Sequence, residues 1–482
     1  MNADQLSQVV GLVNGTDGGV DASSVTTING SLAELVTISD TSANDLTTAS
    51  AYAAVVDEVQ ANASTSDLLK VIAAAIDTGG NGSVSLANVA QITGAVGDIT
   101  SIISNTSVTL KSDVDLVVTG GATADEIVAL KNATSGGITA EASDNSISDF
   151  AGLNTAESSD AITITVTDAS AAAADLTALE SKTSVAITAS GVSEITGTIS
   201  QIQAIVSESN ITTASNYKAT VNSGTATVDQ VNLVKADTTG QITAEIVNTE
   251  VIAELKTLNT QEATDAITMT VGDASVAAAD LTALESKTSV AVTATAVGTI
   301  TGTVTEIVAV VDEGNIVTDG DYIATATSGT GTVDQVNKIK ADTSGVITAE
   351  IVNTETVSEL LTLGTAGTDA ITVTVPVGVH AATDLSALGL LTSVAVNAAQ
   401  ATVVTGSISQ INSLLSDEKV TNPTSMSATI DEGVEAAADL TNLLGKANVT
   451  SVGGQNVTEI TGTISQIQAI VSESNITTAS NY

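Results

Sequence analysis

The chain has 482 residues, of which 55 are acidic and 12 are basic, so its formal charge is −43. This charge excludes nucleic acid and anionic membrane surfaces as expected partners, because both attract clustered lysine and arginine side chains. Hydrophobic residues make up 43% of the chain and aromatic residues only 1%, which is typical of a thin core of Val, Ile, Leu and Ala and not of a disordered acidic tail.

The first 80 residues differ from the rest of the chain. Residues 51–61 and 66–77 carry helical patterns that are longer and less regular than those further on. Residues 1–80 are therefore expected to form either a cap that covers one end of a stack or a set of diverged repeats. No apolar run approaches the ~18–20 residues that a membrane span needs, so no span is expected.

From residue 81 onward, short segments alternate apolar and polar residues, as strands with one buried face do. Examples are DAITITV, SVAITA and QITAEI, which begin at Asp160, Ser184 and Gln241. Corresponding positions recur at steps of about 24 residues, with longer steps where a segment such as GVSEITG intervenes. These positions are Ile138, Ile162, Val185, Tyr217, Ile242, Ile267, Val290, Tyr322, Ile347, Ile371, Val394 and Met426.

Many of the strand patterns are followed by the start signal of a short helix. In a capping box, a Ser or Thr and a Glu or Gln three residues later exchange side-chain and backbone hydrogen bonds. Apolar residues then follow at helical spacing, as in Ile199, Ile202 and Ile205. The pairs are Ser31/Glu34, Thr123/Glu126, Thr198/Gln201, Thr227/Gln230, Thr303/Glu306, Thr332/Gln335, Ser407/Gln410 and Thr463/Gln466.

A strand, a turn and a short helix in about 24 residues predict an α/β fold of the right-handed β/α solenoid type over residues 81–482. Its strands would stack into one parallel sheet with the helices along the other side, in a super-repeat of about 105 residues. The spacing resembles that of leucine-rich repeats in shape, although the leucine-rich consensus is absent. The alternative is a pure β-helix with turns in place of the helices, and the capping boxes count against it.

One block of 24 residues occurs twice without a change, at residues 194–217 and 459–482. Identity over that length indicates recent duplication within an array of repeats. The first copy runs on into KATV, whereas the second ends at Tyr482, so the array is expected to be truncated at its C-terminus and part of a longer one.

Threonine dominates the outward-facing strand positions. Stacked at the ~4.7 Å spacing of neighbouring strands, these residues would form a regular array of hydroxyl and methyl groups. Such an array would match a lattice such as ice, or it would reflect only the strand propensity of Thr on a solvated face. The second interpretation is favoured because Lys218, Glu245 and Glu350 share that face. The array comprises Thr163, Thr165, Thr188, Thr243, Thr268, Thr270, Thr293, Thr348, Thr372 and Thr374.

Five aspartates flank a recurring strand. Three open it and two follow it, namely Asp160, Asp265 and Asp369, and Asp168 and Asp273. Carboxylates at the edges of coils are candidate Ca²⁺ ligands, and Asp that fixes turns through its side chain explains the recurrence equally well. Ca²⁺ is the only cofactor that the sequence suggests.

Catalytic chemistry has no basis in the sequence. His380 is the only histidine, the chain has no cysteine, and no nucleophile elbow, phosphate-binding loop or dinucleotide fingerprint occurs. No catalytic residues are predicted, and the protein is expected not to be an enzyme.

The phrases ADLTALESKTSVAITA and VSEITGTISQIQAI resemble repeats of giant, acidic, Thr/Ala/Val-rich proteins that marine cyanobacteria and other aquatic bacteria secrete or display. That group includes motility-associated cell-surface proteins and large adhesins, and the resemblance covers residues 138–482. It implies an extracellular or cell-surface location and a structural role as a stalk, filament or surface-layer element. The alternative is an adhesin or ice-binding module that uses the Thr-rich face. Expected partners are further copies along the solenoid axis or components of the cell surface.

Overall fold

The computed structural model describes residues 1–13, 19–42, 45–431 and 433–480. It is an α/β structure in which parallel strands alternate with helices, in the manner of a solenoid. The chain divides into two compact units. The first comprises residues 1–225 and 230–244, and the second comprises residues 226–229 and 245–482.

Short elements follow one another up to residue 245. The helices are α1 (Ala3–Val13), α2 (Leu32–Asp40), α3 (Thr65–Ala75), α4 (Val96–Ile103), α5 (Ala124–Ala133), the 3-10 helix η1 (Ile147–Gly152), α6 (Ala173–Glu180), α7 (Ile199–Ser207) and α8 (Val228–Asp237). The strands are β1 (Val20–Ala22), β2 (Thr27–Gly30), β3 (Leu46–Thr48), β4 (Ala53–Val56), β5 (Ala63–Ser64), β6 (Ser83–Leu86), β7 (Gln91–Gly94), β8 (Val108–Leu110), β9 (Asp115–Ala122), β10 (Ile138–Ala142), β11 (Ala161–Thr163), β12 (Ser170–Ala172), β13 (Ile187–Ala189), β14 (Glu194–Gly197), β15 (Ile211–Thr213), β16 (Lys218–Val221) and β17 (Ile242–Glu245).

The same pattern continues after residue 245. The helices are α9 (Ile252–Leu255), α10 (Ala278–Glu285), α11 (Val304–Asp312), α12 (Val333–Asp342), α13 (Val357–Leu360), α14 (Ala382–Leu388), α15 (Ile408–Leu415), α16 (Ala437–Leu444) and α17 (Ile464–Ser472). The strands are β18 (Ala266–Thr268), β19 (Ser275–Ala277), β20 (Val292–Ala294), β21 (Thr299–Thr303), β22 (Ile316–Thr318), β23 (Ile323–Ser328), β24 (Ile347–Glu350), β25 (Ala370–Thr372), β26 (Gly378–Ala381), β27 (Val396–Asn397), β28 (Ala401–Gly406), β29 (Val420–Thr421), β30 (Met426–Ile430), β31 (Gly433–Ala436), β32 (Val449–Gly454), β33 (Val457–Thr461) and β34 (Ile476–Thr478).

A typical coil of the first unit contains two strands and one helix. Strand β6 is followed after a short turn by β7, and α4 begins two residues later. Val84, Ile92 and Ile99, one from each element, are fully buried. Each element is too short to persist alone, because a helix of about three turns is marginal in water. Burial of apolar side chains between successive coils therefore holds the elements in place.

The strands belong to several parallel sheets and not to the single sheet that the sequence predicted. In the first unit, one sheet runs β2-β4-β6-β8 and a second runs β5-β7-β9-β10-β11. The segment GVSEITG, interpreted from sequence as an insertion, contributes strand β14, whose Ile195 is fully buried. The extra strand arises because Ile195 and Gly197 alternate with outward residues, which is the pattern of a half-buried strand.

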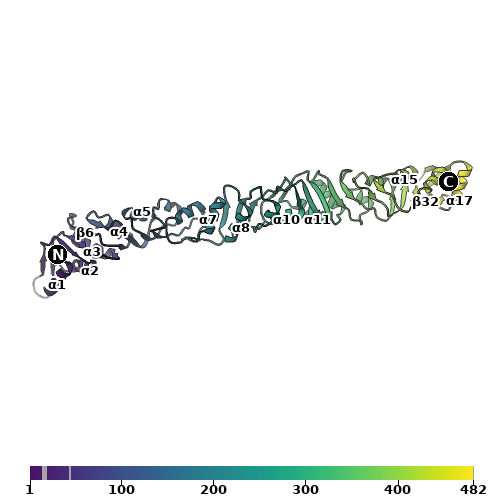
Figure 1. Ribbon diagram of the computed structural model, residues 1–482. Coiled ribbons are helices and arrows are strands. Elements are labelled where there is room, and N and C mark those ends of the chain that lie inside the picture. The colour runs from purple at the N-terminus through teal and green to yellow at the C-terminus, as the bar shows by residue number, and fades with distance from the viewer. Residues whose placement is uncertain (14–18, 43–44, 432, 481–482) are drawn as a thin grey trace. The chain divides into compact units, whose positions relative to one another are not determined.

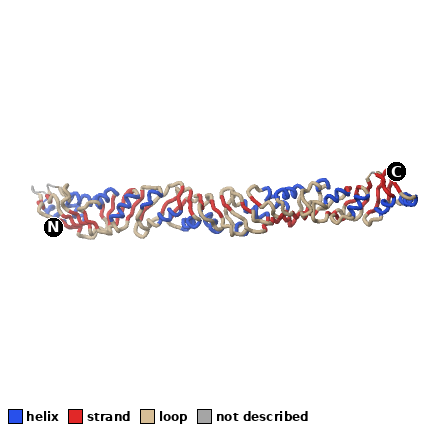
Figure 2. Tube along the Cα trace, turned by 90° about the horizontal axis from the view of Figure 1, so that it is seen from above, coloured by secondary structure: helices blue, strands red, loops and turns tan. Residues whose placement is uncertain are grey.

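The second unit repeats this arrangement. One sheet runs β19-β21-β23-β24-β25 and another runs β26-β28-β30-β32-β34. In the views of Figures 1 and 2, short strands and helices alternate with loops in both units. The structure contains α-helices at the predicted positions. The alternative fold considered from sequence, a pure β-helix with turns in place of helices, is therefore wrong.

The capping boxes mark the helix starts as predicted. Seven of the eight pairs form both hydrogen bonds of the box, at the N-termini of α2, α5, α7, α11, α12, α15 and α17. Helix α8 begins at Val228, directly after the eighth cap residue, Thr227. A further box, Thr356/Glu359 at α13, was not singled out from sequence.

Substitution of Thr123 by alanine is expected to destabilise α5 by about 1 kcal/mol, because the Glu126 amide loses the side-chain acceptor at the N-cap. Hydrogen exchange of the α5 amides measures this change. Thr119→Ala, at an exposed position of β9, is the control and should leave the exchange of α5 unchanged. Equal effects of the two substitutions would contradict the role of the cap.

The prediction of a helix over residues 51–61 is wrong. Strand β4 occupies that segment, whereas the helix expected over residues 66–77 corresponds to α3. Tyr52, Ala54 and Val56 are buried and alternate with less buried neighbours, so the period of two prevails over the helical propensity of Ala. Strands β4 and β5 pair with β6 and β7, which connects residues 1–80 to the coils that follow.

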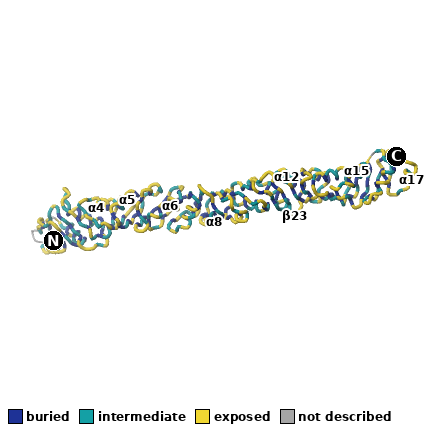
Figure 3. The backbone as a smooth tube through the Cα atoms, turned by 45° about the horizontal axis from the view of Figure 1, so that its top comes forward, coloured by how far each residue is buried: buried dark blue, intermediate teal, exposed yellow. Residues whose placement is uncertain are grey.

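The core of each unit consists of aliphatic side chains inside the coils. Figure 3 shows the buried residues in dark blue along the backbone of each unit, with exposed residues between them. Tyr217 and Tyr322 are the largest fully buried side chains of the described residues. Within the described part of the chain, no helix combines the length and the hydropathy that crossing a membrane requires.

Candidate functional site

The aspartates that open the recurring strand are completely buried. In the first unit, Asp160 accepts hydrogen bonds from the Lys131 ammonium at 2.9 Å and from the backbone N–H of Ile138 at 2.8 Å. Its second oxygen accepts from the Ala156 N–H at 2.7 Å and from the Ser159 hydroxyl at 3.0 Å. Lys131 and Ile138 lie in the preceding coil, so the carboxylate joins two coils.

The second unit contains the same arrangement at Asp369. This carboxylate accepts from the Lys340 ammonium at 3.2 Å and from the N–H groups of Ile347 and Ala366 at 2.9 and 2.8 Å. Asp265 is also completely buried and accepts from the N–H of Gln261 at 2.9 Å. Each of these residues therefore satisfies backbone groups inside the fold.

The environment of Asp160 stabilises its charged form. Burial by itself raises the pKa of this carboxyl. The hydrogen bonds from Lys131, Ala156, Ile138 and Ser159 together lower the pKa by more than burial raises it, so the pKa lies below its ordinary value. The side chain of Lys131 is 15% exposed and that of Asp160 is 0% exposed. Removing either partner of such a pair is strongly destabilising, because it leaves the other charge buried without compensation.

The aspartates that follow the strand accept hydrogen bonds at the N-terminus of a helix in the neighbouring coil. Asp168 accepts from the Ile147 N–H at 2.8 Å and the Ser146 hydroxyl at 2.9 Å, at the start of η1. Asp273 accepts from the Ile252 N–H at 2.9 Å, at the start of α9. A carboxylate at a helix N-terminus satisfies unpaired donors and the helix dipole.

The five aspartates therefore have partners within the chain. None of them lies in a group of three or more His, Asp or Glu side chains arranged to hold a metal ion, and no such group occurs among the described residues. A specific Ca²⁺ site at these positions remains a prediction from sequence.

Buried threonines form a second set of connections between coils, which the sequence analysis missed. The Thr183 hydroxyl accepts from the Ile162 N–H at 2.8 Å and donates to the Ile162 carbonyl at 2.7 Å. Thr288 bonds both backbone groups of Ile267 in the same way, at 2.9 and 2.8 Å. Equivalent positions after a helix or a helical turn are Thr134, Thr238, Thr343 and Thr392, all buried.

A signal for these threonines is present in the sequence. Each is followed by Ser or Thr and stands shortly before a strand segment, as in SKTSV, ADTSG and LLTSV. Their spacing follows the repeat and not the alternation within a strand. Only the backbone groups of the neighbouring coil show why a hydroxyl is required there, since an unpaired buried N–H or C=O is costly.

Two tyrosines provide a third kind of connection. The Tyr217 hydroxyl donates to Asp237 at 2.8 Å in the first unit, and the Tyr322 hydroxyl donates to Asp342 at 2.8 Å in the second. Burial and then the acceptor carboxylate raise the pKa of both tyrosines, so their phenols stay protonated. Both rings fill the interior of their coils.

The ten threonines of the predicted array all lie at exposed or half-exposed positions. They do not form one array, because the strands that carry them belong to different sheets. Thr165 pairs in register with Thr188, and Thr270 pairs with Thr293. Elsewhere the rows are interrupted, since Thr372 lies beside Glu350.

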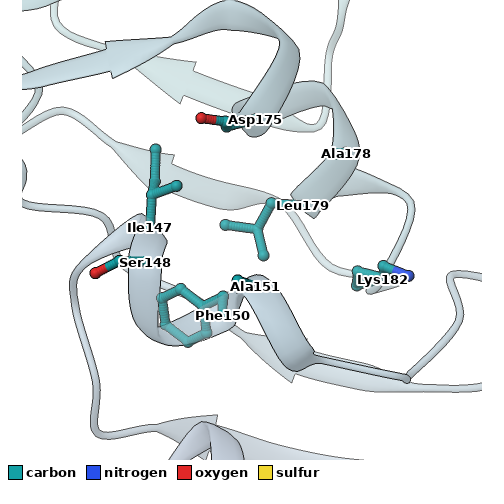
Figure 4. Close-up of a pocket in the computed structure, with 8 residues that line it drawn as sticks. All are labelled: Ile147, Ser148, Phe150, Ala151, Asp175, Ala178, Leu179 and Lys182. Atoms are coloured by element: carbon teal, nitrogen blue, oxygen red, sulfur yellow. The ribbon is translucent and has the colours of Figure 1, made fainter.

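One cavity of about 450 Å³ lies in the first unit, where η1 takes the place of a regular α-helix. Figure 4 shows the lining residues Ile147 and Phe150 of η1 opposite Asp175 and Leu179 of α6, with Lys182 to one side. Phe150 is itself buried. The lining holds no pair of groups placed for acid–base or nucleophilic catalysis.

His380 lies in β26. Its Nε2 is 2.8 Å from the carbonyl oxygen of Pro376, four residues earlier, which indicates a local hydrogen bond. Comparison with protein-family models, with curated proteins and with solved structures found no match to this chain.

Proposed function

We propose that this chain is a non-enzymatic structural repeat segment of a large extracellular or cell-surface protein, working as a stalk, filament or surface-layer element. The observation that carries this proposal is the use of the polar interior. In both units the buried Asp, Thr and Tyr side chains bond groups of neighbouring coils. Side chains of these types, which elsewhere bind substrates or metals, here connect one coil to the next.

The finer architecture belongs to the same proposal. We infer a right-handed solenoid with coils of about 24 residues, similar in shape to leucine-rich repeats, in a super-repeat of about 105 residues. In support, Thr183 and Thr288 stand 105 positions apart, as do Tyr217 and Tyr322, and each pair makes equivalent bonds. Small-angle X-ray scattering of the purified chain tests it, since a single compact globule would contradict a solenoid.

Location is tested on cells. Antibodies raised against this chain should label intact, unpermeabilised cells that produce the protein, and external protease should remove the label. A periplasmic or cytosolic marker protein serves as the control for intact membranes. Labelling only after permeabilisation would contradict the surface location.

An adhesin or ice-binding module is the alternative, and the registered pairs Thr165/Thr188 and Thr270/Thr293 are the observation that favours it. Ice binding requires a flat and uninterrupted array, whereas Glu350 lies beside Thr372. We expect that a solution of the protein shows no thermal hysteresis. A clear thermal hysteresis that the Thr188→Lys variant lacks would favour the alternative. His380→Ala is a control outside the array.

Chelation with EDTA is expected to leave the melting temperature unchanged. The reason is that the oxygens of Asp160 and Asp369 accept hydrogen bonds from the chain itself. Differential scanning calorimetry with and without EDTA, at constant ionic strength, measures this. A fall in the melting temperature that Ca²⁺ restores, and Mg²⁺ does not, would show a structural Ca²⁺ site.

The proposed partners are further coils of the same kind, from a second copy along the stacking direction or from other components of the cell surface. Light scattering across a range of protein concentrations tests self-association. A monomer at the highest concentration would exclude it.

A further inference from the structure

The cavity beside η1 combines an apolar wall with an unpaired negative charge. Ala151 of η1 and Asp175 of α6 both line this cavity of about 450 Å³ (Figure 4). Ile147 and Phe150 of η1 and Leu179 of α6 form its apolar wall. The carboxylate of Asp175 lies at an exposed position and has no ion-pair or hydrogen-bond partner within the described part of the chain.

The second unit repeats this part of the fold at α9 and α10. Helices η1 and α9 each begin at an isoleucine whose N–H donates to an aspartate 21 positions later. Helices α6 and α10 share the sequence AADLTALE. The residue four positions after the isoleucine is Ala151 in the first unit and Lys256 in the second, and the aspartate of the shared sequence is Asp175 or Asp280. The two pairs of positions are therefore equivalent.

In the second unit, a lysine side chain occupies the place that is open in the first. The Lys256 ammonium forms an ion pair with Asp280, so this side chain reaches from the end of α9 to α10 in the neighbouring coil. Asp280 is half-buried in this arrangement, whereas Asp175 is exposed. The third position of this kind, at the end of α13, carries Leu361. Ala151 is thus the smallest side chain of the three, and the cavity lies beside it.

We propose that the cavity beside η1 binds a primary ammonium group on a short aliphatic chain, which is the chemistry of the Lys256 side chain. The ammonium pairs with Asp175, and the methylene groups lie against Ile147, Phe150 and Leu179. The formal charge of −43 raises the concentration of such cations near the protein.

The positive charge of Lys182, which also lines the cavity, is compatible with this ligand. Lys182 follows α6 by two positions, and Lys287 follows α10 by two positions. The ion pair of Lys256 and Asp280 forms in the presence of Lys287. A lysine at this position therefore does not prevent an ammonium group from pairing with the aspartate.

The test titrates the full chain, isotope-labelled at its isoleucine methyl groups, with n-butylammonium chloride at constant ionic strength. The NMR signal of the Ile147 methyl group should shift in a saturable way, because Ile147 lines the cavity. The signal of Ile252, at the equivalent position, should not shift, since Lys256 is in place there. Binding in the millimolar range is expected, because a partly exposed ion pair and a short apolar chain each contribute little free energy.

Two control ligands separate the contribution of the charge from that of the chain. Methylammonium carries the charge without the aliphatic chain, and n-butyrate carries an aliphatic chain with the opposite charge. Both should shift the Ile147 signal less than n-butylammonium does at equal concentration. An equal response to methylammonium would reduce the effect to diffuse attraction of cations, and a stronger response to n-butyrate would place an anion beside Lys182. Either result would overturn the proposal.

Substitutions at the cavity test the role of each margin. Asp175→Asn should weaken the binding of n-butylammonium by about fivefold or more, because it removes the counter-charge. Asp149→Asn is the matched control, since Asp149 is an exposed residue of η1 that does not line the cavity. Ala151→Lys should abolish the response of the Ile147 signal, because the new side chain takes the place of the ligand.

The reverse substitution, Lys256→Ala, should create a second site. The Ile252 signal should then respond to n-butylammonium, while the Ile147 signal keeps its response. The Lys256 side chain is 41% exposed, so its removal should leave the fold intact. Unchanged signals of the isoleucines elsewhere in the second unit would show that it does.

Three further results would overturn the proposal. They are the absence of a saturable shift at Ile147, equal weakening by Asp175→Asn and Asp149→Asn, and no response of Ile252 in the Lys256→Ala variant. N-acetyl-lysine methylamide identifies the source of the ammonium group. Binding tighter than that of n-butylammonium would indicate a lysine side chain of a polypeptide, and weaker binding would indicate a free amine.

Discussion

Replacement of Asp160 by alanine should destabilise the coils around it by about 3–5 kcal/mol, the largest effect expected of any single substitution described here. The change leaves the Lys131 ammonium, which is 15% exposed, without its counter-charge. It also removes the acceptor of the Ile138 and Ala156 N–H groups inside the fold. Hydrogen exchange of amides over residues 131–163 measures the loss, because a repeat array opens locally.

The matched control is Asp113→Ala. Asp113 also pairs with a lysine, Lys111, at 3.2 Å, but both side chains are about half exposed. An exposed pair contributes at most about 1 kcal/mol, so this substitution should change hydrogen exchange little. If both substitutions had the same small effect, the buried carboxylate would not be a structural connection.

The pH dependence of the same region follows from the lowered pKa of Asp160. Since the folded state holds the carboxyl charged more strongly than the unfolded state does, its contribution to stability is complete above the ordinary Asp pKa of about 3.9. That contribution is lost as the pH falls below this value and through the folded pKa. Asp160→Asn should therefore flatten the acid-induced loss of protection over residues 131–163. An unchanged acid profile in the variant would contradict this assignment.

Replacement of Thr183 by valine should cost about 2–4 kcal/mol, although the shape of the side chain is retained. The hydroxyl serves the N–H and the carbonyl of Ile162 together, and Thr183 is 1% exposed, so water does not replace it. Thr183→Ser keeps the hydroxyl and should restore most of the lost stability. Hydrogen exchange of the β11 and β13 amides compares the two variants with the unsubstituted protein.

Thr163→Val provides the comparison at a solvated position. Thr163 lies on β11 next to Ile162 and is exposed, so this substitution should change stability by less than about 0.5 kcal/mol. A cost at Thr163 equal to that at Thr183 would show that strand propensity, and not the hydrogen bonds between coils, decides the choice of threonine.

Local signals predicted the helices well. At Thr198 and Gln201, for example, the partners of the capping box lie three residues apart, so the signal survives whatever the rest of the chain does. The outward direction of Thr163 and Thr188 was likewise predictable, because alternation along a strand decides it. The prediction of a helix over residues 51–61 was wrong, because alanine favours a helix, whereas the alternating burial of Tyr52, Ala54 and Val56 is that of a strand.

The roles of the aspartates could not be predicted from sequence, because their hydrogen-bond donors lie partly in the neighbouring coil. Sequence singled out Asp160 and Asp369 by their recurrence, and offered a metal site or a turn as the reason. Their donors include Lys131 and Lys340, which lie 29 positions away along the chain. No pattern within one strand or one helix indicates such a partner.

The sequence by itself determined an α/β array of repeated short elements, where its helices begin, and an aliphatic core without cysteine. These features follow from composition and from contacts within a few residues. Only the tertiary structure decided that the strands divide among several sheets, and that Thr183 is buried while Thr163 is exposed. The physical reason is that both depend on backbone groups about 20 positions away, which become neighbours only when one coil lies on the next.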